Sequence, residues 1–426
     1  SKLITDKLGN DGYAFANVNA VPELNREKQQ VSFTFFIDPG RRIYVRRVNV
    51  AGNSRTRDEV IRREMRQLEG GWYSTDKITL SKQRVDKLGY FTEVNLETPA
   101  VPGTTDQVDV NVSVVEKPTG MMLFGAGFGS GEGLILSGSI SQNNIFGSGR
   151  HVSLGVTTSQ INTTYSLSYT DPYSTVDGVS RGFDIYYRTL NPADNELARY
   201  ETKTAGGQLR LGVPITEFDT ILYGLGYENV DIVTFPDSPL IYRDYVATFG
   251  PSNSNFFANA AWARDGRDSL IYPTKGTFQR AGLEVGLPGG DLEYFKATYQ
   301  YQRYFPLTRL YTLMVNGEIG YGDGYGDKPL PFFKNFFAGG TNSVRGYKSY
   351  TIGPKDSDGN PRGGSYRIVS NVEFLFPFPG LENDRSVRMG AFVDAGMVGD
   401  DFVNSKDLRY STGVSLLWVS PLGPLK

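Results

Sequence analysis

The feature that most constrains the fold is an alternation of apolar and polar side chains that recurs from residue 121 to residue 420. In FKATYQYQ, for example, odd-numbered residues from Phe295 to Tyr301 form an apolar and aromatic face, and even-numbered residues from Lys296 to Gln302 form a polar face. About fourteen such segments, each about ten residues long, are separated by Gly, Asn, Asp and Pro. An open sheet of that many strands must curl or split, and about nine to eleven residues make a tilted membrane-spanning strand. The alternation predicts a transmembrane antiparallel β-barrel, with a soluble sandwich or propeller as the alternative.

The expected connections between these strands fall into two classes, on opposite rims of the predicted barrel. Moderate turns (NNIFGSG, PITE, PLT and FPGLENDRS) lie on the side from which the first strand enters, and the long segments 231–254 and 321–363 lie on the other side. Short turns on one rim and long loops on the other are typical of outer-membrane barrels. The sequence has no apolar run close to the roughly 18 to 20 residues that a membrane-spanning helix needs.

Charge and composition exclude several kinds of site. The 44 basic and 46 acidic residues nearly cancel, so we do not expect nucleic acid as a partner. The chain has no cysteine and one histidine, His151, which excludes thiolate and multi-histidine metal sites, and we expect no metal and no cofactor. A nucleophile beside His151 is the enzymatic alternative. Because His151 follows Gly149-Arg150 at the start of a predicted strand, we interpret it as a surface residue and expect no enzymatic activity.

Residues 1–117 follow a different pattern, which predicts an α+β region. A strand is expected in RRIYVRRVNV, and two more in FTEVNLET and DQVDVNVSVVE. Between them, the capping-box spacing Thr56–Glu59 and the helix-forming EVIRREMRQLEG predict a helix that ends at Gly70. A second helix is expected from about Thr75 to Leu88. The predicted order is therefore β-α-α-β-β.

The tetrapeptide DKLG occurs at residues 6–9 and again at 86–89, each time before a strand rich in Tyr or Phe and then a second strand. A repeat of about 80 residues indicates tandem copies of one domain, and the sequence enters the first copy partway through. We predict three parts: residues 1–39 as the C-terminal part of one repeat, 40–117 as a complete repeat, and 118–426 as the barrel. The start, SKLITDKLG, has no export signal, which we expect to have been cleaved or to lie outside this sequence.

The alternation also places two carboxylates on the inner wall of the predicted barrel. In YRIVSNVEFLFPF and in the next strand, Glu373 and Asp394 lie opposite the apolar face, so both point into the lumen from neighbouring strands. Two such carboxylates raise each other's pKa unless a cation joins them. The preceding loop carries Arg345 and is long enough to reach the lumen, and a guanidinium suits bidentate contact with carboxylates. The alternatives are an exposed Arg345 above a wet pore, and an acid–base pair of a glycosidase or protease, for which no substrate cleft is evident.

The first predicted barrel strand, MMLFGAGFGSGEG, has glycine at every second position from Gly125 to Gly133. One face of this strand therefore lacks side chains, so the strand packs poorly and costs extra backbone entropy to order. We expect its pairing to be the weakest in the barrel wall, and we call this junction the seam. A nucleotide-binding loop is the alternative, but the G-x-G-x-x-G spacing and the strand-to-helix context are missing.

The segment FFAGGTNSVRGY, with the tip Val344-Arg345-Gly346-Tyr347, resembles the signature loop of the BamA family of outer-membrane assembly factors. GRRIYVRRVNVAGN and the late SPLGPL are also typical of that family, so the resemblance covers the whole chain. It implies a sixteen-stranded barrel preceded by POTRA domains. About fourteen strands are expected here, because the sequence stops at Pro421-Leu422-Gly423-Pro424.

The resemblance also assigns roles to particular residues. It implies that Arg345 meets Glu373 and Asp394 inside the barrel. It implies that Arg62 and Glu69, in REMRQLEG of the last POTRA domain, dock a BamD-like lipoprotein of the assembly complex. The alternative for Arg62 and Glu69 is a solvated helix face with ordinary charge pairs.

By the same resemblance, we expect the chain to fold and insert β-barrel proteins in the outer membrane of a Gram-negative bacterium, with its POTRA domains in the periplasm. The first barrel strand would template client strands by β-augmentation, POTRA sheets would guide clients in the same way, and client folding would supply the energy. The expected templating edge comprises Leu123, Phe124, Gly125, Ala126, Gly127, Phe128 and Gly129. The expected partners are unfolded outer-membrane β-barrel clients, assembly-complex lipoproteins, outer-membrane lipids and periplasmic chaperones.

Four alternative functions remain open from the sequence. A two-partner-secretion exporter shares POTRA domains and the V-R-G-Y loop but passes one dedicated substrate through its pore. A TamA-like translocation and assembly factor differs in the number of upstream repeats. A passive porin would not need periplasmic repeats, and an outer-membrane phospholipase or protease would need a nucleophile beside a base.

Overall fold

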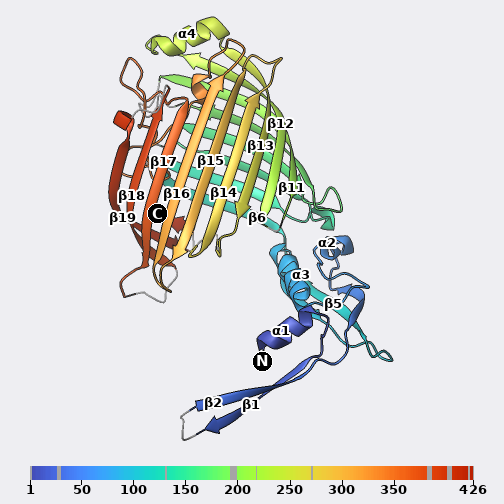
Figure 1. Ribbon diagram of the computed structural model, residues 1–426. Helices are drawn as coiled ribbons and strands as arrows, with labels where there is room; N and C mark the ends of the chain where they lie inside the picture. Colours follow the sequence, from blue (N-terminus) through green and yellow to red (C-terminus); the bar gives the residue numbers. More distant parts are fainter. Residues whose placement is uncertain are drawn as a thin grey trace. The chain divides into compact units, whose positions relative to one another are not determined.

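The computed structural model describes residues 2–25, 30–129, 132–191, 199–216, 218–269, 272–380, 386–400, 405–420 and 423–425. It divides into two compact units, which we treat separately (Figure 1). The N-terminal unit comprises Ser1–Met121 with Gln142–His151, and the sheet unit comprises Met122–Ser141 with Val152–Lys426. Across the described ranges, no helix is both long and apolar enough to cross a membrane. Parts of the motifs singled out above lie outside the described residues: Ser130 and Gly131 of the first barrel strand, Glu217 of PITE, residues 381–385 of FPGLENDRS, and Pro421 and Leu422.

The N-terminal unit contains two small sheets. Strands β1 and β2 form an antiparallel pair, and the second sheet has the order β3-β5-β4, with β3 parallel and β4 antiparallel to β5. From β3 onward the elements follow the predicted β-α-α-β-β order, which is confirmed. The elements are α1 (Lys2–Asn10), β1 (Asn17–Asn25), β2 (Gln30–Asp38), β3 (Tyr44–Ala51), α2 (Asp58–Arg62), α3 (Thr75–Lys87), β4 (Phe91–Glu97) and β5 (Gln107–Glu116).

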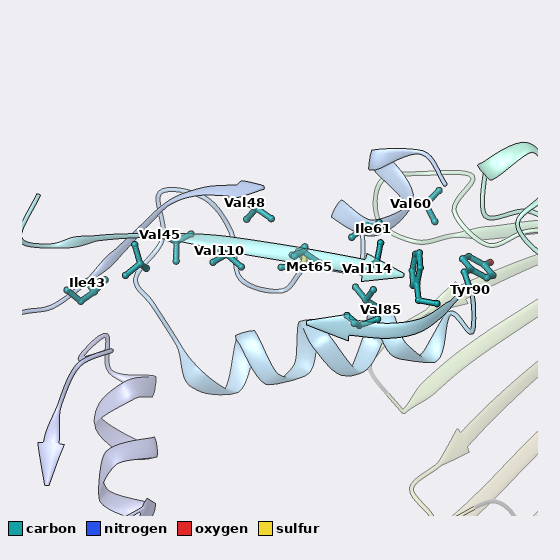
Figure 2. Packing of buried hydrophobic residues seen from close by; sticks show 14 residues of the cluster. Ile43, Val45, Val48, Val60, Ile61, Met65, Val85, Tyr90, Val110 and Val114 are labelled. Atoms are coloured by element: carbon teal, nitrogen blue, oxygen red, sulfur yellow. The ribbon is translucent and has the colours of Figure 1, made fainter. Parts of the chain in front are cut away.

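The core of the N-terminal unit lies between the second sheet and its two helices. Every second residue of β5 from Val108 to Val114 is buried, as the valine alternation predicts for a strand with one covered face. These valines share a cluster with Ile61 of α2 and Val85 of α3, both of which are fully buried (Figure 2). The buried face of β5 and the buried residues of α2 and α3 therefore pack in one apolar layer.

The predicted first helix is wrong in its extent, because α2 ends at Arg62 and does not continue to Gly70. Beyond it, the Ser81 hydroxyl of α3 accepts hydrogen bonds from the backbone N–H of Arg66 (2.8 Å) and of Gln67 (3.3 Å). Backbone amides that find such tertiary partners do not need a helix to be satisfied. Helix propensity in this segment is thus overridden by contacts with α3.

The predicted capping box at Thr56–Glu59 is also wrong. The N-cap position of α2 is Arg57, which makes no capping bond through its side chain. The backbone N–H of Thr56 donates to the carboxylate of Glu116 at 2.6 Å, so the preceding turn is held by β5. The second helix, α3, begins as predicted, and its N-cap Ser74 accepts a bond from the backbone N–H of Lys77.

The sheet unit is one antiparallel meander in which each strand pairs with its sequence neighbours, in the order β6 to β20 (Figure 1). This confirms the predicted fold class. Among the described residues the sheet is open, because β6 and the short β20 stand at its two ends. The strands are β6 (Gly120–Gly129), β7 (Gly133–Gln142), β8 (His151–Thr158), β9 (Asn162–Asp171), β10 (Ser180–Leu190), β11 (Tyr200–Pro214), β12 (Asp219–Thr234), β13 (Ser252–Asp265), β14 (Gly276–Gly286), β15 (Tyr294–Pro306), β16 (Thr312–Gly324), β17 (Tyr366–Pro377), β18 (Val387–Gly399), β19 (Arg409–Ser420) and β20 (Gly423–Leu425).

The sheet has one exposed apolar face and one covered face. In β18, Val393 is 56% exposed whereas the next residue, Asp394, is completely buried. In β19, Val414 on the outer face is 73% exposed. An outer face of this kind suits lipid, and the inner face is covered by a long loop.

Two long connections lie on the rim of the sheet opposite the end at which β6 begins. The connections cover residues 235–251 and 325–365 rather than 231–254 and 321–363, because β12 and β16 end later than expected, β13 begins earlier and β17 begins later. The strands are extended because their ends remain paired, for example Thr234 with Tyr200. We call residues 325–365, between β16 and β17, the lumen loop.

The shorter of these two connections contains α4 (Leu240–Phe249), which packs on an aromatic cluster. Tyr242 of α4 lies 4.9 Å from the ring of Tyr200 and 4.8 Å from the ring of Phe332, measured between ring centroids. All three are buried. The cluster joins α4 to β11 and to the start of the lumen loop.

Candidate functional site

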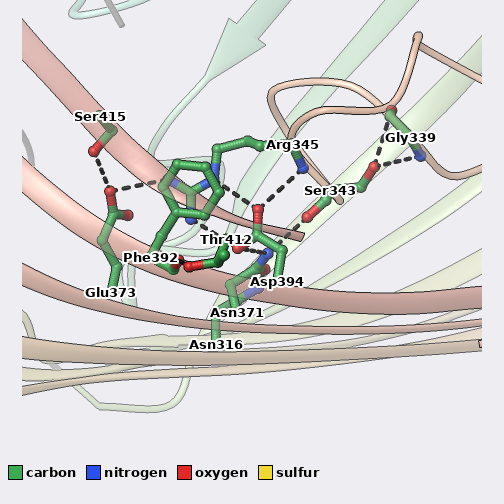
Figure 3. Close-up of polar contacts among 10 residues, drawn as sticks. All are labelled: Asn316, Gly339, Ser343, Arg345, Asn371, Glu373, Phe392, Asp394, Thr412 and Ser415. Carbon is green, nitrogen blue, oxygen red and sulfur yellow. Dashed lines mark hydrogen bonds and ion pairs between the residues drawn. The ribbon is translucent and has the colours of Figure 1, made fainter. Parts of the chain in front are cut away.

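The structure brings Arg345 of the lumen loop together with Glu373 of β17 and Asp394 of β18 (Figure 3). Arg345 Nε and Nη2 donate to the two carboxylate oxygens of Asp394, each at 2.7 Å, and Nη1 donates to Glu373 at 2.9 Å. The backbone N–H of Arg345 also donates to Asp394, at 3.0 Å. We call this arrangement the tip contact. Its geometry is the bidentate fork that guanidinium and carboxylate form most strongly.

Burial makes the tip contact energetically important. Asp394 is completely buried, Glu373 is 3% exposed and Arg345 is 9% exposed. Charges that have left water in this way are stable only when each is paired and its remaining lone pairs are hydrogen-bonded. Both carboxylates are already bound by Arg345, so neither is presented to a substrate as a free acid or base.

Neutral groups complete the tip contact, and the sequence did not identify their roles. The Asn371 amide donates to Asp394 at 2.9 Å and to the backbone oxygen of Ser343 at 2.6 Å. The hydroxyl of Ser415 donates to Glu373, and the Arg345 guanidinium lies 3.5 Å from the centroid of the Phe392 ring. Asn371 and Phe392 each precede an inner-facing carboxylate by two residues, so the same alternation puts them on the inner face, and this was the signal in the sequence.

The remaining residues of the loop tip fix its position. Val344 is fully buried in a cluster with Val369 of β17 and Val398 of β18. A Cβ on Gly396 would lie 2.6 Å from a methyl of Val344, so glycine is required there for the tip to approach β18. Tyr347, the last of the four signature residues, donates its hydroxyl to the backbone oxygen of Tyr410 at 3.2 Å. Gly346, between Arg345 and Tyr347, has a φ of +86°, a backbone conformation that residues with a side chain rarely adopt.

The seven residues of the expected templating edge all lie on β6, at one end of the sheet. Within the described residues, β6 pairs only with β7. Phe124 and Phe128 are each 82% exposed. A Cβ on Gly125 would meet the Ser137 hydroxyl at 2.6 Å, whereas one on Gly127 would meet nothing within 4 Å.

Arg62 and Glu69 lie in the N-terminal unit and form an ion pair with each other at 3.5 Å. Arg62 also pairs with Asp58, and Glu69 accepts a bond from the backbone N–H of Val48 at 2.8 Å. Both side chains are exposed. His151 contacts the side chain of Asn143 through its Nδ1.

Comparison with known proteins identifies related sequences over both units. Residues 144–426 match the model of the Omp85 superfamily domain, and residues 43–117 match the POTRA model, described as a surface antigen variable number repeat. The outer membrane protein assembly factor BamA of Neisseria meningitidis serogroup B is 38% identical, over 99% of this chain and 58% of its own length. BamA of Nitratidesulfovibrio vulgaris is 30% identical, over 100% of this chain and 53% of its own length. The chain therefore spans little more than half the length of these relatives.

A solved structure matches over nearly the whole chain. The crystal structure of BamA from Haemophilus ducreyi lacking POTRA domains 1–3 has a TM-score of 0.78 and 32% sequence identity. The match covers 99% of this chain and 87% of that one. Both units therefore have a counterpart in a single known protein.

Proposed function

The chain belongs to the Omp85 superfamily and is an outer-membrane protein with periplasmic POTRA domains, and from that premise we propose that it folds and inserts β-barrel proteins into the outer membrane. The observation that carries this proposal is the composition of β6, the first strand of the sheet, where glycine at every second position from Gly125 to Gly129 leaves one face without side chains. The likeness to the two BamA relatives supports it.

A client strand that enters the membrane needs partners for its backbone N–H and C=O groups. Unpaired N–H and C=O groups cost several kcal/mol each in hydrocarbon, so a strand that enters the membrane alone is strongly disfavoured. Residues Leu123–Gly129 present backbone partners in advance, and the client adds to them by β-augmentation. Because glycine leaves part of β6 without side chains, its own pairing is weak enough to exchange for client pairing. The energy then comes from client folding, without nucleotide hydrolysis or other catalysis.

The tip contact serves this function by holding the C-terminal strands in place. Arg345 joins β17 to β18 and ties both to the lumen loop. Removing one partner of a buried ion pair typically costs about 3 to 5 kcal/mol of stability. A loss of that size is enough to loosen the strands of the wall near the seam. Arg345, with Val344, Gly346 and Tyr347 around it, therefore stabilises β17 and β18, the strands that support the seam.

The N-terminal unit supplies the periplasmic contacts. Residues 1–39 are the C-terminal part of one POTRA domain, 40–117 are a complete POTRA domain, and 118–426 are the barrel. The exposed Arg62 and Glu69 dock an assembly-complex lipoprotein, and the free edges of the POTRA sheets receive client segments delivered by periplasmic chaperones.

Site-specific photo-cross-linking tests the proposal. A cross-linkable residue at Phe124 or Phe128 is expected to capture many different nascent outer-membrane proteins. Leu225 is a matched control, because it is 56% exposed on the same outer face but belongs to the central strand β12. Capture of one dedicated substrate would instead indicate an exporter. Capture of none, or equal capture at Leu225, would refute templating at β6.

A further inference from the structure

The lumen loop makes a second charged contact, at the point where it enters the lumen. Lys334, in the short 3-10 turn η3 (Phe332–Lys334), donates to Glu228 of β12 at 2.8 Å and to Glu284 of β14 at 3.1 Å. Its ammonium also lies 5.1 Å from the ring centroid of Tyr294 in β15. We call this arrangement the root contact.

The two acceptors of the root contact are also held by side chains other than Lys334. Glu228 accepts bonds from Tyr186 of β10 (2.9 Å) and from Asn255 of β13 (3.0 Å). Glu284 accepts a bond from the hydroxyl of Tyr294 at 2.5 Å. The side chain of Glu228 is only 5% exposed and that of Lys334 is 17% exposed. Carboxylates fixed this way form a socket for one ammonium group, which unlike a guanidinium can donate in three directions.

The backbone at Lys334 is fixed as well as its side chain. Lys296 of β15 donates to the backbone oxygen of Lys334 at 2.6 Å. The same ammonium lies 4.3 Å from the centroid of the Phe336 ring, two residues further along the loop. These contacts set the direction in which the chain leaves Lys334.

The root and tip contacts hold opposite ends of one loop segment to different parts of the wall. Lys334 and Arg345 are separated by eleven positions, a length of chain that spans at most about 36 to 40 Å. The root contact lies on β12 and β14, whereas the tip contact lies on β17 and β18, and β15 and β16 stand between them in the sheet. The segment 334–345 therefore connects the central strands with the C-terminal strands by a path other than the sheet itself.

We propose that Lys334 is a second positioning residue of the lumen loop, which fixes the loop's entry on β12 and β14 independently of Arg345. With both ends held, the segment 334–345 acts as a strut that sets the spacing between the central and C-terminal strands. A loop held at its tip alone would transmit no position from the central wall to β17 and β18. The proposal concerns the geometry of the loop and does not depend on the assembly function.

Hydrogen exchange of the whole purified protein, read by mass spectrometry, tests the proposal. Lys334→Met is expected to raise exchange at the amides of residues 334–336 about tenfold and to leave residues 343–345 within about twofold, because the tip contact is intact. Arg345→Ala should give the reverse pattern. Lys334→Arg should restore much of the root protection, because it keeps the charge. Lys348→Met, on an exposed lysine of the same loop, is the matched control and should change neither region.

Lys334→Met leaves Glu228 and Glu284 without this cation, so a second variant separates loss of the root contact from general destabilisation. The triple variant Lys334→Met, Glu228→Gln, Glu284→Gln removes the uncompensated charge and is expected to recover stability while residues 334–336 stay exchange-labile. Unchanged root protection in Lys334→Met would overturn the proposal. Equal loosening of root and tip in the triple variant would overturn it too, because the two ends would then not be held independently.

Discussion

Replacement of Arg345 by alanine is the most direct perturbation of the tip contact. The variant loses three side-chain hydrogen bonds, two to Asp394 at 2.7 Å and one to Glu373 at 2.9 Å. It keeps the backbone N–H bond to Asp394 and the bonds that Asn371 and Ser415 donate to the two carboxylates. What remains is a pair of buried carboxylates with partial hydrogen bonding and no cation.

The expected loss of stability follows from these two buried carboxylates, which keep some hydrogen bonds but have no cation. Removing one partner of a buried ion pair costs about 3 to 5 kcal/mol, and the surviving donors place this case near the lower end, at about 3 kcal/mol. Because about 1.4 kcal/mol corresponds to a factor of ten, the folding equilibrium should fall by more than about 100-fold.

Two assays measure this loss. The temperature at which the folded, fast-migrating form disappears in an SDS gel reports stability, and the rate of client assembly in proteoliposomes reports function. Arg345→Lys keeps the charge but lacks the fork, so it should recover part of the stability. Arg345→Ala with Glu373→Gln and Asp394→Asn should recover more, because no buried charge is left unpaired. If Arg345→Ala keeps wild-type migration and assembly rates, the tip contact does not hold the strands.

Three further predictions concern single positions. Gly127→Ala should stabilise the fold by about 0.5 to 1 kcal/mol in thermal unfolding, because its Cβ meets no neighbour, and the tighter seam should slow client assembly. Gly396→Ala should displace Val344, cost about 1 to 3 kcal/mol and raise hydrogen exchange at the loop tip; unchanged exchange would contradict the packing. Burial raises the pKa of Glu116, but hydrogen bonds from Thr56 and its neighbours outweigh it and leave the pKa below the usual 4.5. A carboxylate whose pKa is lowered by folding stabilises the folded state at pH values above its pKa in the unfolded chain. This stabilisation is lost as the pH falls through its pKa in the folded state. Glu116→Gln should therefore weaken the N-terminal unit in urea at pH 7, and its difference from wild type should shrink as the pH falls through the lowered pKa of Glu116; a difference that stays constant with pH would exclude this linkage.

The inner face of the sheet was predictable because strand geometry leaves no choice. Side chains alternate strictly, so Glu373 and Asp394 had to share the inner wall once their strands were recognised. The family resemblance then connected Arg345 to them. Alternation gives the face of a residue but not its height along the barrel or its partner across it, which is why the pairing of Lys334 with Glu228, 106 positions away, was not foreseen.

In the N-terminal unit, local sequence did not predict where the first helix ends. The helix expected to reach Gly70 stops at Arg62, because the hydroxyl of Ser81 binds the amides of Arg66 and Gln67. A sequence window over residues 59–70 contains good helix formers but no information on a hydroxyl that approaches from α3. Local propensity therefore predicted that helices occur and where α3 begins, and tertiary contacts decided where α2 ends.

The lumen loop also bears on permeability. A sheet of this width, curled on itself, would admit ions and small hydrophilic solutes if its interior were empty. Residues 334–345 cross that interior and are held at both ends. The loop therefore restricts the passage of solutes along the inner face of the curled sheet, and under the proposed function clients would pair at the edge of the wall instead of passing through its interior.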